Sequence, residues 1–387
     1  MRSLLLRKLG YFLFALLLLH LIIEVTGHHY LYQTLKMTVF KGQLGPGIQE
    51  YEELPKRVIA HDPGAAWPKA QNYNSGSLGS DAEAFHEAYE SVSFLVVHRD
   101  SILFEKYWDG FDDASISNSF SMAKSVVSLL TGIAIDKGYL KSVDDPVYHY
   151  LPQYETELGK ELKIWHLLSM SSGINFDEHY LNPFAFPARA NYGDDLEGLL
   201  RNYEVTETPG QVFNYQSGTT QVLGMLLTAA TRMSLSEMTQ EWVWKPLGAE
   251  ADAIWSLDHE DGVEKAFCCI NARAQDFARI GKLYLQNGKW AAQQVVDSAY
   301  IAKTIQPAPL MNQEGEPCTT YGYSWWIAEH DGEYVFYMRG IKGQYVLVMP
   351  SKDLIVVRLG RKRFFGNTHP APEDVHRYLE MGLSMIE

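Results

Sequence analysis

Cysteine is scarce in this sequence. The 387 residues include three cysteines, of which two are adjacent at positions 268 and 269 and the third is at position 318. Three cysteines are too few for a fold held together by disulfides, and no pair has the C-x-x-C spacing of a structural zinc site. A bridge from Cys268 or Cys269 to Cys318 is one alternative and three buried thiols are the other, and we favour the thiols.

Positive charge is also in short supply. Lys and Arg number 33 against 47 Asp and Glu, which gives a formal net charge of -14. A protein that follows a phosphate backbone needs a positive surface, so nucleic acid is not expected among the partners. The 46% hydrophobic and 21% charged residues are typical of a globular protein and exclude collagen-like, low-complexity and wholly disordered chains.

Several common catalytic motifs are missing. The sequence has no P-loop, no G-x-G-x-x-G fingerprint and no G-x-S-x-G elbow. The zinc motif H-E-x-x-H fails because His86-Glu87 is followed by Glu90 where the second histidine would stand. We therefore expect no cofactor and no metal.

The one long hydrophobic run is at the N-terminus. Residues 9–23 are apolar apart from His20, and Arg2, Arg7 and Lys8 precede them. Such a run lies between the roughly 20 residues of a spanning helix and the roughly 7–15 of a signal-peptide core. We favour an uncleaved anchor in the inner or plasma membrane, with the rest of the chain facing the periplasm or exterior. The alternative is a secreted or periplasmic protein after signal cleavage.

The remaining patterns divide the chain into an irregular lead-in at residues 28–80 and one domain at 81–387. Strand patterns occupy a hairpin at 93–108 and the segments 321–330, 333–340 and 344–360. Helical patterns occupy 120–137, 271–288, 372–386 and most of 160–240. Strands at both ends with helices between them predict an α+β fold, an α/β sandwich. One sheet would be built from both chain ends, with a mostly helical insertion packed against it.

Ser121-Met122-Ala123-Lys124 is an S-x-x-K pattern. Alone it is weak, because roughly one or two chance matches are expected in this length. Its position adds weight, because it opens the predicted helix, with Asn118 or Ser119 as the N-cap, and places Ser121 and Lys124 on one face. That helix is apolar on most of its surface, and a lysine buried there needs a partner or a lowered pKa. The pattern predicts a serine nucleophile with a lysine base.

Three other segments are candidates for the same cleft. Tyr215 lies in a loop just before a predicted helix, although most tyrosines serve packing. Residues 338–344, Met-Arg-Gly-Ile-Lys-Gly-Gln, join two strands, and glycines there allow close backbone approach. Asp177-Glu178-His179 follows a Ser-Ser-Gly turn and could line the cleft.

In this order, the segments resemble the serine β-lactamase and penicillin-binding-protein superfamily. More narrowly, they resemble the class C-like serine hydrolases, in the branch of esterases and 6-aminohexanoate-dimer hydrolases. The resemblance covers residue 93 to the C-terminus and includes the stretches 120–152, 164–174, 209–218, 272–288 and 340–357. It implies a β-lactamase/transpeptidase-like fold with an antiparallel sheet, and it implies no metal.

The resemblance also implies a role for each matching residue. Ser121 would be the acylated nucleophile and Lys124 would take its proton. Tyr215 would help pass the proton to the leaving group and activate the deacylating water. The backbone N–H groups of Ser121 and Ile341 would form the oxyanion hole. The residues implied to contact substrate are Ser217, Arg339, Gly340 and Lys342.

Two departures from the family pattern bear on the substrate. The Y-x-N motif is Tyr215-Gln216-Ser217 here, and the K-T-G motif is Met338-Arg339-Gly340. The lysine that helps hold the carboxylate of a penicillin is therefore missing, which favours a small-molecule ester or amide as substrate. A penicillin-binding-type peptidase, a β-lactamase or a β-lactam sensor is the alternative, and a non-enzymatic binding protein on this fold is a third. The oligomeric state is open.

Overall fold

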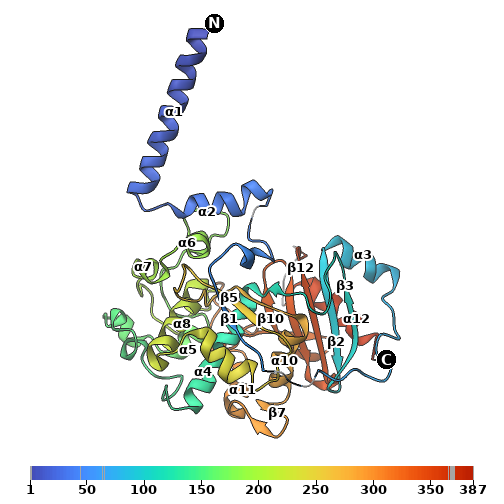
Figure 1. The fold of residues 1–387 in the computed structure, drawn as a ribbon. Coiled ribbons are helices and arrows are strands. Elements are labelled where there is room, and N and C mark those ends of the chain that lie inside the picture. The colour runs from blue at the N-terminus through green and yellow to red at the C-terminus, as the bar shows by residue number, and fades with distance from the viewer. Residues whose placement is uncertain are drawn as a thin grey trace.

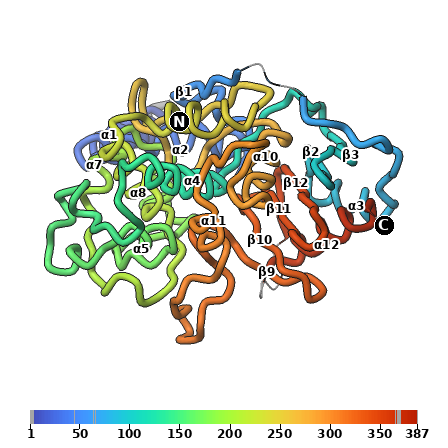
Figure 2. The backbone as a smooth tube through the Cα atoms, turned by 90° about the horizontal axis from the view of Figure 1, so that it is seen from below, coloured from blue at the N-terminus to red at the C-terminus, as the bar shows by residue number. Residues whose placement is uncertain are grey.

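The computed structural model describes residues 2–43, 45–62, 64, 66–364, 366 and 371–386. Within these ranges the chain forms a long N-terminal helix that stands away from a folded domain (Figure 1). One side of the domain is built on a sheet and the other side is mostly helical (Figure 2). The predicted α+β architecture, with a helical insertion between the two halves of the sheet, is confirmed.

The main sheet has six strands in the order β3-β2-β12-β11-β10-β9, and every neighbouring pair is antiparallel. Strands from the two ends of the domain meet at the centre, where β2 pairs with β12. The sheet is therefore built from both chain ends, as predicted. The strand bounds are β2 Ser91–His98, β3 Ser101–Tyr107, β9 Trp326–His330, β10 Glu333–Gly340, β11 Gln344–Met349 and β12 Leu354–Gly360.

The backbone conformation of the two turn residues explains why β2 and β3 form a hairpin. Arg99 and Asp100 both have positive φ, at 47° and 64°, which is the backbone of a two-residue turn that matches the twist of paired strands. The other predicted strand boundaries are close to those observed, with two exceptions. β9 begins at Trp326 rather than residue 321, and the predicted segment 344–360 is two strands, β11 and β12, joined by a 3-10 turn at Pro350–Lys352.

Helices cover both faces of this sheet. α10 (Ala274–Leu285) packs on the face that carries Val346 and Val357, together with the core of the helical part. α12 (Glu373–Leu383) packs on the opposite face, against Leu347 and Val356, and α3 (Ser80–Ala88) adds Phe85 to that layer. Alternate strand residues therefore enter two separate apolar layers, as the period of a strand requires.

The helical part lies between the two halves of the sheet in the sequence. Its helices are α4 Ala123–Asp136, α5 Ile164–Leu168, α6 Phe186–Tyr192, α7 Leu196–Leu200, α8 Ser217–Thr231, α9 Leu235–Thr239 and α11 Ser298–Thr304. A second sheet, in the order β1-β5-β6-β4, joins this part to the lead-in. Its bounds are β1 Lys56–Ile59, β4 Ser117–Asn118, β5 Ala253–Ser256 and β6 Ile270–Ala272, and β7 Lys289–Trp290 and β8 Gln293–Gln294 form a separate pair.

The lead-in is more regular than the sequence suggested. It contains α2 (Tyr30–Met37) and the edge strand β1, which pairs with β5. Both are short, and tertiary contacts rather than local pattern stabilise them. Tyr30 and Met37, for example, are the two residues of α2 that are buried.

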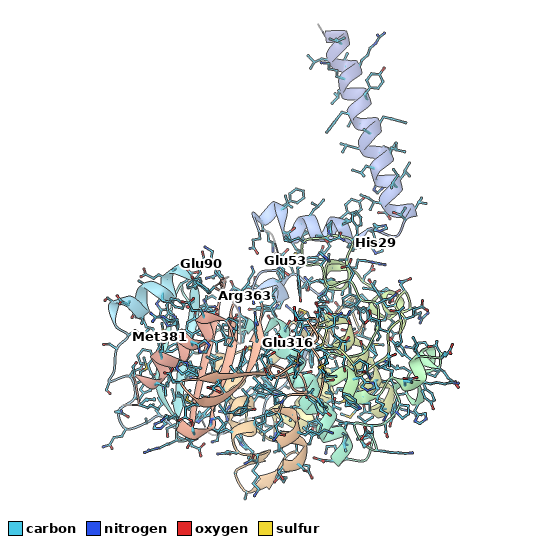
Figure 3. All side chains as sticks on the ribbon, turned by 180° about the vertical axis from the view of Figure 1, so that it is seen from behind. His29, Glu53, Glu90, Glu316, Arg363 and Met381 are labelled. Atoms are coloured by element: carbon cyan, nitrogen blue, oxygen red, sulfur yellow. A yellow bond between two sulfur atoms is a disulfide. The ribbon has the colours of Figure 1, made fainter. Side chains whose placement is uncertain are left out.

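α1 (Arg2–Val25) is a single exposed helix, and Leu4–Val25 is long and apolar enough to cross a membrane. It is longer than the apolar run at residues 9–23. His29 lies where the linker after α1 meets the domain (Figure 3). Its Nε2 is 2.8 Å from Oδ1 of Asp194, which helps hold the linker against the helical part.

The cysteines differ from the prediction. Cys268 and Cys269 are joined by a disulfide, and Cys318 is a free, buried thiol. The expectation of three thiols is therefore wrong, and neither proposed bridge to Cys318 forms. The usual Cα separation of about 4.4–6.8 Å argues against a bridge between neighbours. Here the Cα atoms are 3.7 Å apart, in a turn where Cys269 has a φ of 74°.

A buried histidine between α3 and the sheet makes stability depend on pH. His86 is stacked on Trp108, and Nδ1 is 2.8 Å from Ser91 Oγ. Burial, and then the nearby Arg358 and Lys106 cations, lower the pKa of His86 to about 3. The folded protein therefore holds this group neutral at pH values where the unfolded chain, with a pKa near 6.5, binds a proton.

We expect the contribution of neutral His86 to the free energy of unfolding to be fully present above pH 6.5 and to be lost as the pH falls from 6.5 towards 3. At pH 4.5 the loss is about 2–3 kcal/mol in the free energy of unfolding. His86→Gln flattens that dependence, whereas His149→Gln, at an exposed histidine, leaves it unchanged. Urea unfolding of the full chain in detergent at pH 7.5 and 4.5 measures the difference. An equal pH dependence in the wild type and His86→Gln would contradict the assignment.

Candidate active site

Ser121 lies in a tight turn between β4 and α4. Phe120 has a φ of 44°, a left-handed conformation that is uncommon for a bulky residue. The turn is held on both sides, because Asn118 Oδ1 accepts a hydrogen bond from the Phe120 N–H at 2.8 Å and the Ser119 N–H donates to the Ile270 carbonyl at 2.7 Å. Residues 120–122 form a 3-10 turn whose N-cap residue is Ser119, one of the two predicted, although its side chain makes no capping hydrogen bond; α4 itself begins at Ala123 after Met122.

Lys124, in the first turn of α4, is buried, with 1% of its surface exposed. Its Nζ is 3.0 Å from Ser121 Oγ, 3.3 Å from Ser217 Oγ and 2.9 Å from the Phe267 carbonyl oxygen. Ser217 and the Phe267 carbonyl oxygen hold the nitrogen within hydrogen-bond distance of the Ser121 hydroxyl. A lysine base at this distance is placed to take the serine proton.

Glu178 fixes Ser217 on the far side of the lysine. Its carboxylate accepts one hydrogen bond from the Ser217 hydroxyl at 2.5 Å and one from the Ser217 backbone N–H at 2.8 Å. Because Ser217 is the first residue of α8, the carboxylate also lies at a helix N-terminus, where negative charge is favoured. Since the Ser217 hydroxyl donates to Glu178, its oxygen lone pairs are free to accept from Lys124.

Tyr215 lies beside the lysine and is not among the residues that line the cavity. Lys124 Nζ is 5.1 Å from the centroid of the Tyr215 ring, and the ring packs at 5.4 Å from that of Trp326. The guanidinium of Arg339 lies over the same Trp326 ring, 4.9 Å from its centroid. Tyr215 and Arg339 therefore both pack on Trp326, and the structure brings Ser121, Lys124, Tyr215 and Ser217 together.

The end of β10 runs beside the serine turn. Gly340 allows this approach, because a Cβ at that position would lie 2.3 Å from the Ser119 carbonyl oxygen. Ile341, the next residue, lines the same cavity as Ser121. Arg339, Gly340 and Lys342 are not among the residues that line it. Burial lowers the pKa of Lys342.

Buried Arg358 holds the loop that follows β10. Its Nη1 donates to the carbonyl oxygens of Lys342 and Gly343, at 2.9 and 2.8 Å, and its Nε donates to Ser91 Oγ at 3.0 Å. This one side chain therefore ties the loop after Ile341 to β2 and β12, which positions Ile341 from a rigid sheet.

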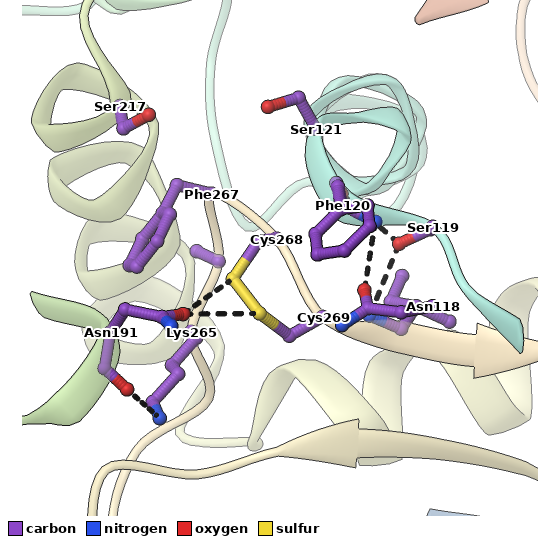
Figure 4. Close-up of a disulfide and its surroundings, with 12 residues drawn as sticks. Asn118, Ser119, Phe120, Ser121, Asn191, Ser217, Lys265, Phe267, Cys268 and Cys269 are labelled. Carbon is purple, nitrogen blue, oxygen red and sulfur yellow. Dashed lines mark hydrogen bonds between the residues drawn. A yellow bond between two sulfur atoms is a disulfide. The ribbon is translucent and has the colours of Figure 1, made fainter. Parts of the chain in front are cut away.

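The cavity beside Ser121 has a volume of about 240 Å³. The Ser121 and Ser217 hydroxyls point towards each other at its base (Figure 4). Phe267 and Cys268 form part of the wall, and Asn191 Oδ1 lies within 3.9 Å of both sulfur atoms of the disulfide. The remaining lining comes from Phe120, from α2 and the segment that follows it, from the loop before α6, and from α6 itself: Thr34, Thr38, Gly45, Pro46, Tyr180, Leu181, Pro183, Pro187, Ala188 and Tyr192.

Some of these contributors had no clear sequence signal. The Phe267 carbonyl is backbone, so residue identity gives no hint of it. Glu178 was recognisable only as an acidic residue after a turn, and its contact with Ser217 spans 39 positions. The described residues contain no group of three His, Cys, Asp or Glu side chains that could hold a metal.

Comparison with known proteins identifies the family. The family described as Beta-lactamase matches residues 80–376, well over half of the chain, and the protein belongs to it. The chain is also similar to the 6-aminohexanoate-dimer hydrolase of Paenarthrobacter ureafaciens. The two are 25% identical over 284 residues, which cover 69% of this chain and 71% of the relative. The resemblance to this superfamily of hydrolases is therefore confirmed.

Solved structures share the fold. A provisionally assigned 6-aminohexanoate-dimer hydrolase from Bacillus anthracis aligns with a TM-score of 0.73 at 20% identity, covering 87% of this chain and 92% of that one. A family VIII carboxylesterase aligns with a TM-score of 0.63 at 16% identity, covering 83% and 99%. The domain is thus a β-lactamase-fold hydrolase.

Glu178 offers a test of how the site is positioned. Glu178→Ala removes both acceptors of Ser217. We expect kcat for an ester substrate to fall roughly 10–100-fold with little change in KM, because charge-assisted hydrogen bonds contribute free energy of that size. Glu178→Gln keeps one acceptor oxygen and recovers part of the loss. Asp177→Asn, at the neighbouring exposed carboxylate, is the matched control and retains wild-type kinetics. A rise in KM at constant kcat would assign Glu178 to substrate binding instead.

Proposed function

We propose that the protein is a serine hydrolase that cleaves an ester, or a small amide, through an acyl-enzyme on Ser121. The observation that carries this proposal is the 3.0 Å contact between Lys124 Nζ and Ser121 Oγ, at the base of a cavity and in a family of hydrolases. A buried lysine amine within hydrogen-bond distance of a serine hydroxyl is the arrangement that nucleophilic catalysis needs.

The proposed reaction has two halves. Ser121 Oγ attacks the carbonyl carbon while its proton moves to Lys124 Nζ, and the developing oxyanion accepts hydrogen bonds from the N–H groups of Ser121 and Ile341. The C–O or C–N bond then breaks, and the leaving alcohol or amine takes a proton with the help of Tyr215. Water attacks the acyl-Ser121 ester in the second half, with the same groups as base, and releases the acid.

The lining of the cavity supports an ester or small amide over a carboxylate-bearing β-lactam. None of the described residues around it is charged, so the cavity offers no partner for a substrate carboxylate. A cation does lie nearby, because Arg339 shares the Trp326 ring with Tyr215. That cation favours a penicillin-binding-type or β-lactamase activity as the second candidate.

We also propose that the domain lies outside the cytoplasm, anchored by α1. α1 is long and apolar enough to span a membrane. The Cys268–Cys269 disulfide is consistent with an oxidising compartment, where disulfides persist.

Two chromogenic substrates test the activity. The full chain in detergent is incubated with p-nitrophenyl acetate and, separately, with nitrocefin. Ester turnover with little nitrocefin hydrolysis is the expected result, and a burst of p-nitrophenol equal to the enzyme concentration would reveal the acyl-enzyme. Nitrocefin turnover would favour the second candidate. No reaction with either, and no labelling of Ser121 by a fluorophosphonate, would overturn the proposal.

A further inference from the structure

The surface around the cavity mouth is unusually apolar. Outside α1, the described residues include twelve exposed large apolar side chains, and seven of them lie in two segments. Four follow the membrane helix: Tyr32, Leu35, Val39 and Phe40. Three lie in the loop before α6: Tyr180, Leu181 and Phe184. We refer to these seven side chains as the apolar rim. Contiguous exposed apolar surface of this kind marks an interaction site.

The two segments of the apolar rim adjoin each other. Tyr30 Oη donates to the Pro183 carbonyl at 3.0 Å, and the His28 ring lies 5.5 Å from that of Phe184. Both segments also contribute to the cavity, through Thr34 and Thr38 on one side and Tyr180 and Leu181 on the other. The rim therefore adjoins the cavity that contains Ser121, and Tyr180 and Leu181 belong to both.

The rim is also close to the proposed membrane helix. α1 ends at Val25 and α2 begins at Tyr30, and five Cα steps span at most about 17 Å even when fully extended. α2 lies directly beneath the end of α1 and above α6 in Figure 1. If α1 crosses the bilayer, residues 30–41 must lie at or near its surface.

The absence of acidic residues from this segment is consistent with a place at the bilayer surface. Residues 28–43 contain no Asp or Glu, although the whole chain carries a net charge of -14. Phe40 and Leu181 are 80% and 88% exposed, which is costly in water and favourable at a lipid interface. Acidic side chains, which an anionic membrane surface would repel, are thus absent from the segment nearest the bilayer.

We propose that the apolar rim rests on the bilayer that holds α1, and that the cavity takes a neutral ester with an acyl chain directly from that bilayer. This inference rests on the proposed function. The acyl chain would lie along Leu181, Pro183, Pro187 and Phe267. Ser121 Oγ forms a bond to the acyl carbon as the ester C–O bond breaks, the alcohol leaves with the serine proton, and water then releases the fatty acid.

The docking part is tested without any enzyme assay. A Phe40→Cys variant in a Cys318→Ser background carries an NBD fluorophore at the rim. In the same background, Tyr139→Cys carries it at an exposed site shortly after α4, a helix that Figure 1 shows across the domain from α2. The full chain is reconstituted in phosphatidylcholine vesicles with and without spin-labelled lipid. We expect a blue-shifted, lipid-quenched probe at position 40 and a water-exposed, unquenched probe at 139.

The substrate part is tested by comparing two esters. The double variant Phe40→Ser/Phe184→Ser changes rim residues that do not line the cavity. We expect it to hydrolyse p-nitrophenyl acetate at a rate within twofold of wild type. Its rate on p-nitrophenyl palmitate embedded in the vesicles should fall roughly tenfold or more, because one or two aromatic side chains no longer bind the lipid. Tyr139→Ser retains both activities.

The outcomes separate the two proposals. An unquenched probe at position 40, whether exposed to water or buried against a second copy of the chain, overturns the docking. If the probe is quenched but the double variant hydrolyses both esters at the wild-type rate, the bilayer is not the source of the substrate. Failure of the wild type on every ester overturns the substrate part, and if Ser121 is also not labelled by a fluorophosphonate and nitrocefin is not hydrolysed, it overturns the proposed function as well. The probe still decides whether the rim contacts lipid.

Discussion

Replacing Ser121 by alanine is expected to abolish hydrolysis. The substitution removes the only atom that can form the acyl-enzyme, and kcat/KM for p-nitrophenyl acetate should fall by roughly 10⁴-fold or more, as in other serine hydrolases that lose the nucleophile. The fold should survive, because the Ser121 hydroxyl has one hydrogen-bond partner, Lys124, and is not needed to hold the turn at Phe120. Initial rates and a thermal melt of the full chain in detergent measure both effects.

Ser125→Ala is the matched control for this loss. Ser125 lies one turn further along α4, is equally a serine, and donates to the Ser324 carbonyl at 2.6 Å away from the cavity. We expect it to lose stability by about 1–2 kcal/mol through the missing hydrogen bond while turnover persists. Turnover retained in Ser121→Ala would exclude Ser121 as the nucleophile.

Replacing Lys124 by methionine is expected to have the second-largest effect. Methionine keeps most of the volume of the side chain but cannot accept the serine proton, so kcat/KM should fall by roughly 10³-fold, a typical contribution of a general base. The rate of fluorophosphonate labelling of Ser121 should fall in parallel, because both reactions need the same deprotonation. The Phe267 carbonyl loses its donor, which costs about 1–3 kcal/mol of stability.

Lys265→Met is the control that distinguishes a loss of catalysis from the loss of stability caused by removing any buried lysine. Lys265 is also 1% exposed and donates to a backbone carbonyl, that of Asn191, at 2.7 Å. Burial lowers its pKa to about 8, but none of its hydrogen bonds reaches Ser121. We expect a comparable loss of stability with labelling of Ser121 retained. Equal loss of labelling in both variants would indicate that Lys124 acts only through the fold.

Much of the architecture was predictable from local pattern. The hairpin at β2 and β3, the helix that begins near Ser121 and the strand β10 all follow from periodicity and turn residues that act over a few positions. The family resemblance extended this to the order of the elements. Short elements were missed, because α2 and β1 are stabilised by distant partners, Tyr30 by Pro183 and β1 by β5.

The class of fold, the apolar N-terminal helix and the S-x-x-K pair could be predicted without coordinates, because each depends on residues close together in the chain. Tertiary structure alone decided the environment of Lys124, where acceptors 93 and 143 positions away meet at one nitrogen. It also decided the disulfide between adjacent cysteines and the apolar rim at the cavity mouth. These features depend on contacts between distant segments, and burial and distance exist only once the chain has folded.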